Sequence, residues 1–437
     1  MTDGDAAARD AIEATLEAIE VVWRIEAPRL VAALARVVRD LGRAEELAQD
    51  AFVVALERWP AAGIPERPGA WLLETARRRA LDQLRRDRRL QRAKEEIGAE
   101  VAAKELAPPD FGATLDDAVG DDLLRLVFMT CHPIVPAEGR VALTLRLLGG
   151  LTTAEIARAF LVPEATVAQR IVRARRTLAD ARVEFEMPAA GELAARRASV
   201  LEVIYFVFNE GYAATAGDAW TRPELCEEAL RLGRIVAALA PAEPEVHGLV
   251  ALMELQASRL RARVGPAGEP VLLADQDRSR WDPLLIGRGL AALSLARAAA
   301  GSEALSGPYL LQAEIAACHA RSRAPEETEW ARVAALYARL AQIAPSPVVE
   351  LNRAVALSML FGPEGGLAVV DALAGEPALA DYHLLPTVRG DLLSKLARHD
   401  EARREFERAA ALAKNACERH LLLERAAACA RAVSGPT

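Results

Sequence analysis

Residues 150–176 of the chain, GLTTAEIARAFLVPEATVAQRIVRARR, are the stretch that says most about the fold. They predict a helix, a tight turn and a second helix. Thr152 and Glu155 have the spacing of a capping box at the start of the first helix. Pro163 suits the first position of the second helix, where an amide hydrogen is not needed. The stretch therefore predicts a helix-turn-helix.

The second helix of this motif separates its apolar residues from its polar ones. The apolar residues recur at steps of four, three and four and predict a buried stripe: Val167, Ile171, Ala174 and Leu178. The residues left facing outward are Thr166, Gln169, Arg170, Arg173 and Arg176. A helix that reads base edges in the major groove of DNA needs this arrangement. We therefore expect a DNA-recognition helix, with an ordinary helical hairpin as the alternative.

A second basic segment lies earlier in the chain, at residues 70–94. It contains nine Arg and Lys residues against three Asp and Glu residues, a local charge of +6. Its apolar positions predict a stripe that faces a core: Leu73, Ala76, Ala80 and Leu84. A different face carries Arg78, Asp82, Arg85 and Arg89. Such a face suits a DNA backbone, because each neutralised phosphate releases counterions. The alternative is a solvated charged face.

The composition of the whole chain favours helices. Ala, Leu, Arg and Glu dominate, hydrophobic residues make up 52% and aromatic residues only 5%. These residue types form helices more readily than sheets, so we expect an all-α fold. At 437 residues the chain exceeds one ordinary domain. A net charge of −8 argues against a protein that simply coats nucleic acid, although it leaves room for local basic patches.

Several classes of protein are disfavoured by the reactive residues. The five cysteines are scattered without CxxC spacing, and we interpret them as small buried hydrophobes. The six histidines are dispersed, and no Gly-rich phosphate loop or nucleophile motif occurs. We therefore expect no enzymatic activity, no catalytic residues, no cofactor and no metal. We also find no signal-peptide pattern and no apolar run as long as a membrane span, so we expect a cytoplasmic chain without membrane contact.

Breaks in the helical pattern divide the chain. We expect a helical domain at residues 1–94, a linker at 95–120, a compact helical domain at 121–185 and a long series of amphipathic helices at 190–437. In this last part the small residues Ala354 and Gly390 are 36 positions apart, close to the tetratricopeptide period of about 34. We therefore expect a helical repeat domain that resembles tetratricopeptide repeats, with ordinary helical hairpins as the alternative.

In this order, the two basic segments resemble the two domains of extracytoplasmic-function (ECF) sigma factors of bacterial RNA polymerase. Residues 40–59, which include AEELAQDAF and ALERW, resemble the polymerase-binding helix of the first sigma domain. Residues 71–86 resemble the helix that melts the promoter and reads its minus-ten element. Residues 150–176 resemble the motif that reads the minus-thirty-five element. Together these matches cover about the first 185 residues.

The rest of the chain resembles one subgroup of these sigma factors. Residues 205–212 (YFVFNEGY), 275–281 (DQDRSRW) and 346–355 (SPVVELNRAV) are similar to segments of the subgroup with a tetratricopeptide-like C-terminal extension. The extension is suited to bind a protein or peptide, because helical repeats present a concave surface. The charged and aromatic residues of the first two segments are either contacts between domains or satisfied polar clusters within the repeat domain.

The resemblance implies roles for particular residues. In or beside the contact with the clamp of core RNA polymerase it places Glu46, Asp50, Phe52 and Trp59. Near the separated promoter strand it places Arg77, Arg78, Asp82, Arg85 and Arg86. Near the upstream promoter duplex it places Thr166, Gln169, Arg170 and Arg173.

The function that the resemblance implies is that of a sigma factor with a C-terminal regulatory domain. Two alternatives remain: a helix-turn-helix regulator with a repeat-type sensor domain, and a repeat scaffold with vestigial DNA-binding segments. The basic segment at residues 70–94, which precedes the helix-turn-helix, favours the sigma factor over the regulator. The intact arginine faces argue against the scaffold.

Overall fold

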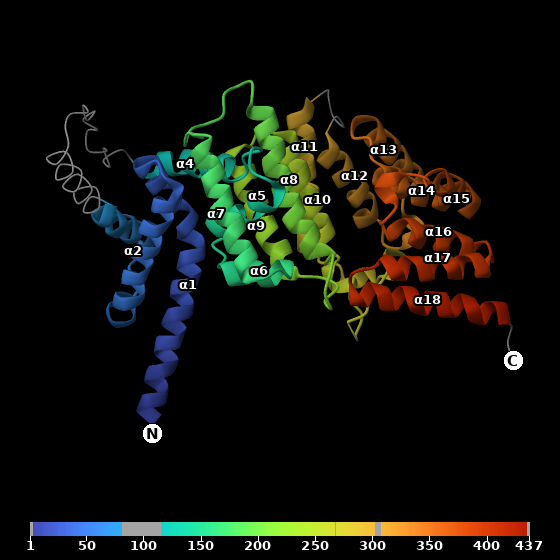
Figure 1. Cartoon of the computed structure of the whole chain (residues 1–437), viewed down its shortest axis with the longest axis horizontal. Helices are drawn as coiled ribbons and strands as arrows, with labels where there is room; N and C mark the ends of the chain where they lie inside the picture. Colours follow the sequence, from blue (N-terminus) through green and yellow to red (C-terminus); the bar gives the residue numbers. More distant parts are fainter. Residues whose placement is uncertain (1–2, 81–114, 267, 302–306, 435–437) are drawn as a thin grey trace. The chain divides into compact units, whose positions relative to one another are not determined.

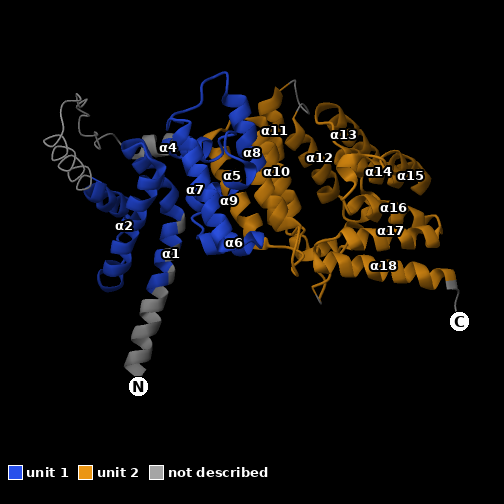
Figure 2. Ribbon diagram, viewed as in Figure 1, with its two compact units in different colours: residues 1–203 blue, residues 204–437 orange. Residues whose placement is uncertain are grey.

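A computed structural model of the chain describes residues 3–80, 115–266, 268–301 and 307–434 (Figure 1). Within these ranges every regular element is a helix, so the all-α prediction is confirmed. The chain divides into two compact units, Met1–Val203 and Ile204–Thr437 (Figure 2). The boundary falls inside one helix, α8 (Leu193–Tyr212).

Unit 1 is built from helices of 8 to 36 residues. Its elements are α1 (Asp3–Val38), α2 (Leu41–Ala62), a helix at residues 68–80, α4 (Leu115–Thr130), α5 (Ala137–Leu147), α6 (Thr153–Phe160), α7 (Glu164–Asp180) and the first turns of α8. In this unit α1 packs on α2 and α4, and α7 packs on α5 and α6. The carboxylate of Asp40 caps α2 by accepting a hydrogen bond from the Arg43 amide at 2.8 Å. Gly63, with a φ of 82°, ends the same helix.

The core of the first helices is partly aromatic. Trp59 is buried, and its ring lies 5.2 Å from that of Trp71 in an edge-to-face arrangement. In the helix at residues 68–80, the buried positions are Leu72, Ala76 and Ala80. The sequence pattern placed Leu73 in this stripe, but Leu73 is only half-buried and Leu72 takes its place.

The predicted helix-turn-helix is present as α6 and α7. The Thr152 hydroxyl accepts from the Glu155 amide at 3.1 Å, and the Glu155 carboxylate accepts from the Thr152 amide at 2.7 Å, so the capping box is confirmed. Leu161 makes the turn in a left-handed conformation, with a φ of 51°. Pro163 is the N-cap of α7. The sequence pattern had predicted it at the first helical position, which Glu164 occupies instead. The predicted inward stripe of α7 is buried at all four positions.

A buried carboxylate joins α2 to the helix-turn-helix region. Glu45 is 6% exposed. Its Oε1 accepts from Nε of Arg146 in α5 at 2.7 Å and from Nε2 of Gln49 at 2.8 Å, and its Oε2 pairs with the guanidinium of Arg175 in α7. Burial lowers the pKa of Arg146 and of Arg175, because each guanidinium gives up part of its hydration. A buried carboxylate is tolerated only when such partners satisfy it.

The first turns of α8 complete unit 1. The guanidinium of Arg196 donates to the carbonyl of Phe128 at 2.8 Å. The Ser199 hydroxyl donates to the carbonyl of Cys131, and Arg140 of α5 pairs with Glu202 at 3.0 Å. Unit 1 therefore depends on residues beyond position 190.

Unit 2 contains the rest of α8 and ten further α-helices in its described part. They are α9 (Pro223–Leu239), α10 (Pro244–Ala257), α11 (Pro283–Ala300), α12 (Pro308–Arg321), α13 (Trp330–Ile343), α14 (Pro347–Phe361), α15 (Pro363–Ala372), α16 (Leu384–Lys395), α17 (His399–Leu412) and α18 (Ala416–Ser434). From α12 onward each helix packs on the next in sequence. Gly390 of α16 lies so close to Phe406 of α17 that an added Cβ would sit 2.9 Å from the ring. This order is the one that a helical repeat has; the tetratricopeptide assignment itself stays a prediction.

One helix of unit 2 departs from an expectation. By length and composition alone α11 could cross a membrane, whereas the sequence analysis found no run of that length. In the structure α11 packs on α10 and α12 through buried Gly289, Leu293 and Ala296. Its Arg297 forms an ion pair with the buried Glu314 of α12. These contacts bury one face of α11, and 22% of the helix is buried.

We predict that Glu45→Gln weakens unit 1. The substitution removes the negative charge that Arg146 and Arg175 share and should cost about 3 kcal/mol, as expected for a broken buried pair. Amide hydrogen exchange in α2, α5 and α7 should then be faster by roughly a hundredfold. The matched control is Glu46→Gln, because Glu46 is exposed. Equal protection in both variants would contradict the assigned role of Glu45.

Candidate nucleic-acid interface

The outer face of α7 brings together the residues predicted to read duplex DNA. Gln169 and Arg173 are exposed, and Thr166 and Arg170 are half-buried on the same side of the helix. Among the described residues, no carboxylate pairs with the guanidinium group of Arg170 or Arg173. Both groups therefore stay available to an external acceptor such as a base edge or a phosphate.

The arginines of α7 lie on two different sides of the helix. Arg175 points to the inner side, where it neutralises Glu45. Arg176 is exposed and lies 3.4 Å from Asp180 in a surface pair. Because exposed pairs contribute at most about 1 kcal/mol, a phosphate can replace Asp180 as the partner of Arg176. The helix thus has a structural side and a free cationic side.

The second predicted DNA surface is only partly described. Arg77 is half-buried and Arg78 exposed, and their guanidinium groups lie 3.8 Å and 3.1 Å from the carboxylate of Glu74. Asp82, Arg85 and Arg86 lie outside the described residues. Glu74 was not singled out from the sequence, although its spacing of three and four residues from the two arginines is the signal of helical ion pairs.

The four residues predicted to contact polymerase do not form one surface. Glu46 is exposed, and Asp50 is half-exposed with its carboxylate 2.9 Å from Arg79. Phe52 packs on Trp23 with 4.5 Å between the ring centroids. Trp59 lies in the core against Trp71. Only Glu46 and Asp50 present polar groups to the outside.

Two apolar residues of α2 that were not predicted to be exposed lie beside Glu46 and Asp50. Val53 and Leu56 of α2 are 49% and 36% exposed. Together with Glu46, Asp50 and Glu57 they form a mixed face along the helix at steps of three and four. Their spacing from these charged residues is the signal in the sequence that could have placed Val53 and Leu56 outside.

In unit 2, the two charged and aromatic segments noted in the sequence meet in one cluster. The guanidinium of Arg263 lies 3.8 Å from the ring centroid of Tyr212. Arg259 lies 5.7 Å from the ring centroids of both Tyr212 and Trp281. Arg278 stacks on Trp281 at 5.0 Å and donates to the carbonyl of His319 at 2.9 Å. Burial and the nearby arginines lower the pKa of His319 to about 4, so its ring is neutral at pH 7. These groups contact one another within the unit, although Nε of Arg263 and of Arg278, the indole N–H of Trp281 and Nδ1 of His319 are buried without a hydrogen-bond partner in the described part of the chain.

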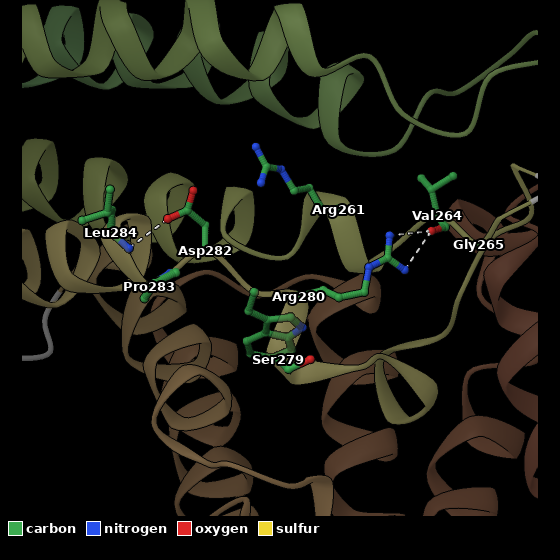
Figure 3. A pocket seen from close by; sticks show the side chains of 9 residues that line it. Arg261, Val264, Gly265, Ser279, Arg280, Asp282, Pro283 and Leu284 are labelled. Carbon is green, nitrogen blue, oxygen red and sulfur yellow. Dashed lines mark hydrogen bonds between the residues drawn. The ribbon is translucent and has the colours of Figure 1, made fainter.

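A cleft of about 660 Å³ lies beside this cluster, near the start of α11 (Figure 3). Figure 3 shows Arg280 reaching the backbone carbonyl of Val264, at 3.5 Å, and Asp282 accepting from the amide of Leu284, at 2.8 Å. Arg280 and Asp282, two of the three charged residues that line the cleft, thus have local partners. In the part of the chain that the structure describes, no group of three or more His, Cys, Asp and Glu side chains is placed to hold a metal ion.

Comparison with known families assigns the domains of unit 1. Residues 23–90 match the family described as Sigma-70 region 2, and residues 125–178 match Sigma-70, region 4. Residues 196–297 match a family of unknown function, DUF6596. Region 4 contains the helix-turn-helix, and region 2 contains α2 and the helix at residues 68–80.

The chain also has relatives among known proteins. It is 45% identical to an uncharacterized protein of Rhizobium meliloti (strain 1021) over 393 residues, which are 90% of this chain and 91% of that protein. It is 32% identical to the ECF RNA polymerase sigma factor SigK of Mycobacterium ulcerans over 154 residues, which are 34% of this chain and 78% of the relative. It is 29% identical to the probable ECF RNA polymerase sigma factor SigI of Mycobacterium tuberculosis over 186 residues, 42% of this chain and 61% of the relative.

No solved structure matches the chain. Both sigma domains are nevertheless present in order, and SigK and SigI, which the chain resembles over 154 and 186 residues, are named as ECF sigma factors. The chain therefore belongs to the ECF sigma factors, the proteins that direct RNA polymerase to promoters.

Proposed function

We propose that this sigma factor uses three surfaces of unit 1 for initiation and that unit 2 regulates them. The observation that carries the proposal is the outer face of α7: an intact helix-turn-helix presents exposed Gln169 and Arg173 and half-buried Arg170, and no carboxylate of the described residues pairs with either arginine. Core polymerase and promoter DNA are in the cytoplasm of a bacterium, and we place the chain there with them.

The upstream contact is made by α7. Gln169 has the amide needed for a bidentate pair with adenine, and Arg170 has the guanidinium needed for guanine. Arg173, which is more exposed and farther along the helix, is suited to a phosphate or a base. These contacts place the protein in register on the upstream duplex.

The downstream contact is made by the helix at residues 68–80 and the basic residues that follow it in sequence. Arg78 exchanges its surface pair with Glu74 for a DNA phosphate, and this exchange is cheap because the pair is exposed. Opening the first base steps costs a few kcal/mol in lost pairing and stacking. Phosphate contacts and the capture of unpaired bases offset that cost.

The polymerase contact is made by the outer face of α2. Glu46 and Asp50 supply charge, and Val53 and Leu56 supply apolar area beside it. This mixture is typical of protein interfaces. Phe52 and Trp59 hold α2 in place through Trp23 and Trp71.

Regulation by unit 2 is proposed from its size and its chemistry. It adds 234 residues after Val203, whereas the two sigma domains end by residue 178. Its series of packed helices offers an extended surface for a protein or peptide. A regulator in the same chain has the advantage of a high effective concentration.

We predict that Glu46→Lys weakens binding to core polymerase. A reversed charge at the contact should raise the dissociation constant by roughly tenfold, mainly through slower association. Co-migration or fluorescence titration with purified core measures the effect. Glu186→Lys makes the same charge change at an exposed site outside α2 and should bind as the unchanged chain does. Equal binding by both variants would remove α2 from the contact.

We predict separate effects from the two DNA surfaces. Gln169→Ala and Arg170→Ala should each cost about 1–3 kcal/mol at promoters whose upstream element carries the base that they read. Arg78→Ala should lower transcription at all promoters alike and make it less sensitive to salt. Transcription by the reconstituted holoenzyme on promoter variants checks both. Unchanged promoter preference in the two α7 variants would exclude direct base reading by this face.

We predict that removal of unit 2 changes transcription. The truncation should follow Val203, because Arg196, Ser199 and Glu202 hold α4 and α5. The truncated chain should still bind core, which serves as its folding control, but transcribe at a different level from the full chain. Residues 204–437 added separately should restore that level. Identical activity of the truncated and full chains, in vitro and in cells, would show that unit 2 is no regulator.

A further inference from the structure

One large apolar side chain of α7 faces away from the core. Val172 is 62% exposed, more than any other large hydrophobic residue in the described part of unit 1. The apolar residues of the inward stripe, Val167, Ile171, Ala174 and Leu178, fill the core and are between 1% and 6% exposed. Val172 therefore makes no contribution to the core of the helix-turn-helix, and a β-branched residue in mid-helix also lowers helix propensity.

The position of Val172 relates it to the DNA-reading residues. It follows Gln169 by three residues and precedes Arg176 by four, so all three share the outer face of α7. Ala165 and Ala168 are also exposed and extend the row of Val172 toward the start of the helix. These small side chains leave room for the helix backbone to approach the floor of a groove.

The major groove contains one apolar group, the C5 methyl of thymine. Resting on the proposed function, in which α7 enters this groove, we infer that Val172 contacts a thymine methyl of the upstream element and makes the protein select thymine there. Side chains three residues apart on a helix are about 5–6 Å apart, and base pairs are about 3.4 Å apart. The thymine therefore lies one or two base-pair steps from the base that Gln169 reads.

A protein partner is the other kind of surface that could cover Val172. The neighbours of Val172 favour DNA, because Gln169 and Arg173 flank it with groups suited to base edges and phosphates. A single valine among such groups also offers too little apolar area for the centre of a protein interface. The test below separates the two.

The test removes the methyl group from the DNA and the side chain from the protein in turn. A duplex is first selected by the holoenzyme, made with the full chain, from a library with a randomised upstream element. Each thymine of that element is then replaced by uracil, which lacks only the methyl group. We expect one replacement to weaken holoenzyme binding about three- to fourfold, the effect of one buried methyl group.

The matching protein variants make the assignment specific. Val172→Ala should bind the thymine and uracil duplexes equally, whereas Val172→Thr, which keeps a methyl group at the branch, should still prefer thymine. Ile134→Ala removes an apolar side chain that is 47% exposed outside α7 and should behave as the unchanged chain does.

Two different failures are distinguishable. If no uracil replacement weakens binding, or if Val172→Ala keeps the full preference for thymine, the inference about Val172 is overturned while selective binding stands. A Val172→Ala variant that loses affinity for core polymerase instead would assign the residue to a protein contact and likewise overturn it. If the holoenzyme selects no upstream element at all, the proposed function of α7 fails first.

Discussion

The buried carboxylate of Glu45 is the constraint that fixes how unit 1 is arranged. A charge in this position must be neutralised by partners that the local chain does not provide. Arg146 and Arg175, which lie 101 and 130 residues later, provide them. α2 is thereby tied to α5 and α7. The ion pair with Glu45 directs Arg175 inward. The cationic face of α7 therefore consists of Arg170, Arg173 and Arg176.

Capping signals and helical spacing predicted most of the elements, but they did not predict the ion pairs of Glu45 with Arg146 and Arg175. The capping box at Thr152 and Glu155 and the inward stripe of α7 follow from spacing alone, and both are present. Glu45 lies four residues after Leu41 and three before Ala48, on the apolar side of α2, but nothing in the sequence says whether its charge is neutralised there. That neutralisation depends on arginines that only tertiary packing brings near. In the helix at residues 68–80, Leu72 takes the core position that was predicted for Leu73.

In the candidate site, too, helical spacing predicted some positions, whereas tertiary packing decided others. The outward residues of α7 were predictable, because a helix with one buried stripe determines its own exposed face. Trp59 was expected in or beside the polymerase contact, but a large aromatic ring gains more by burial against Trp71. Val53, Leu56 and Val172 were not predicted to be exposed, since an apolar residue at helical spacing normally indicates the core.

The central claim is that the two sigma domains of this chain make polymerase specific for promoters. Run-off transcription of a genomic fragment library, with core polymerase alone and with core plus the full chain, tests it most directly. The account predicts discrete transcripts from a subset of fragments only when the chain is present. A transcript pattern identical to that of core polymerase alone would contradict it.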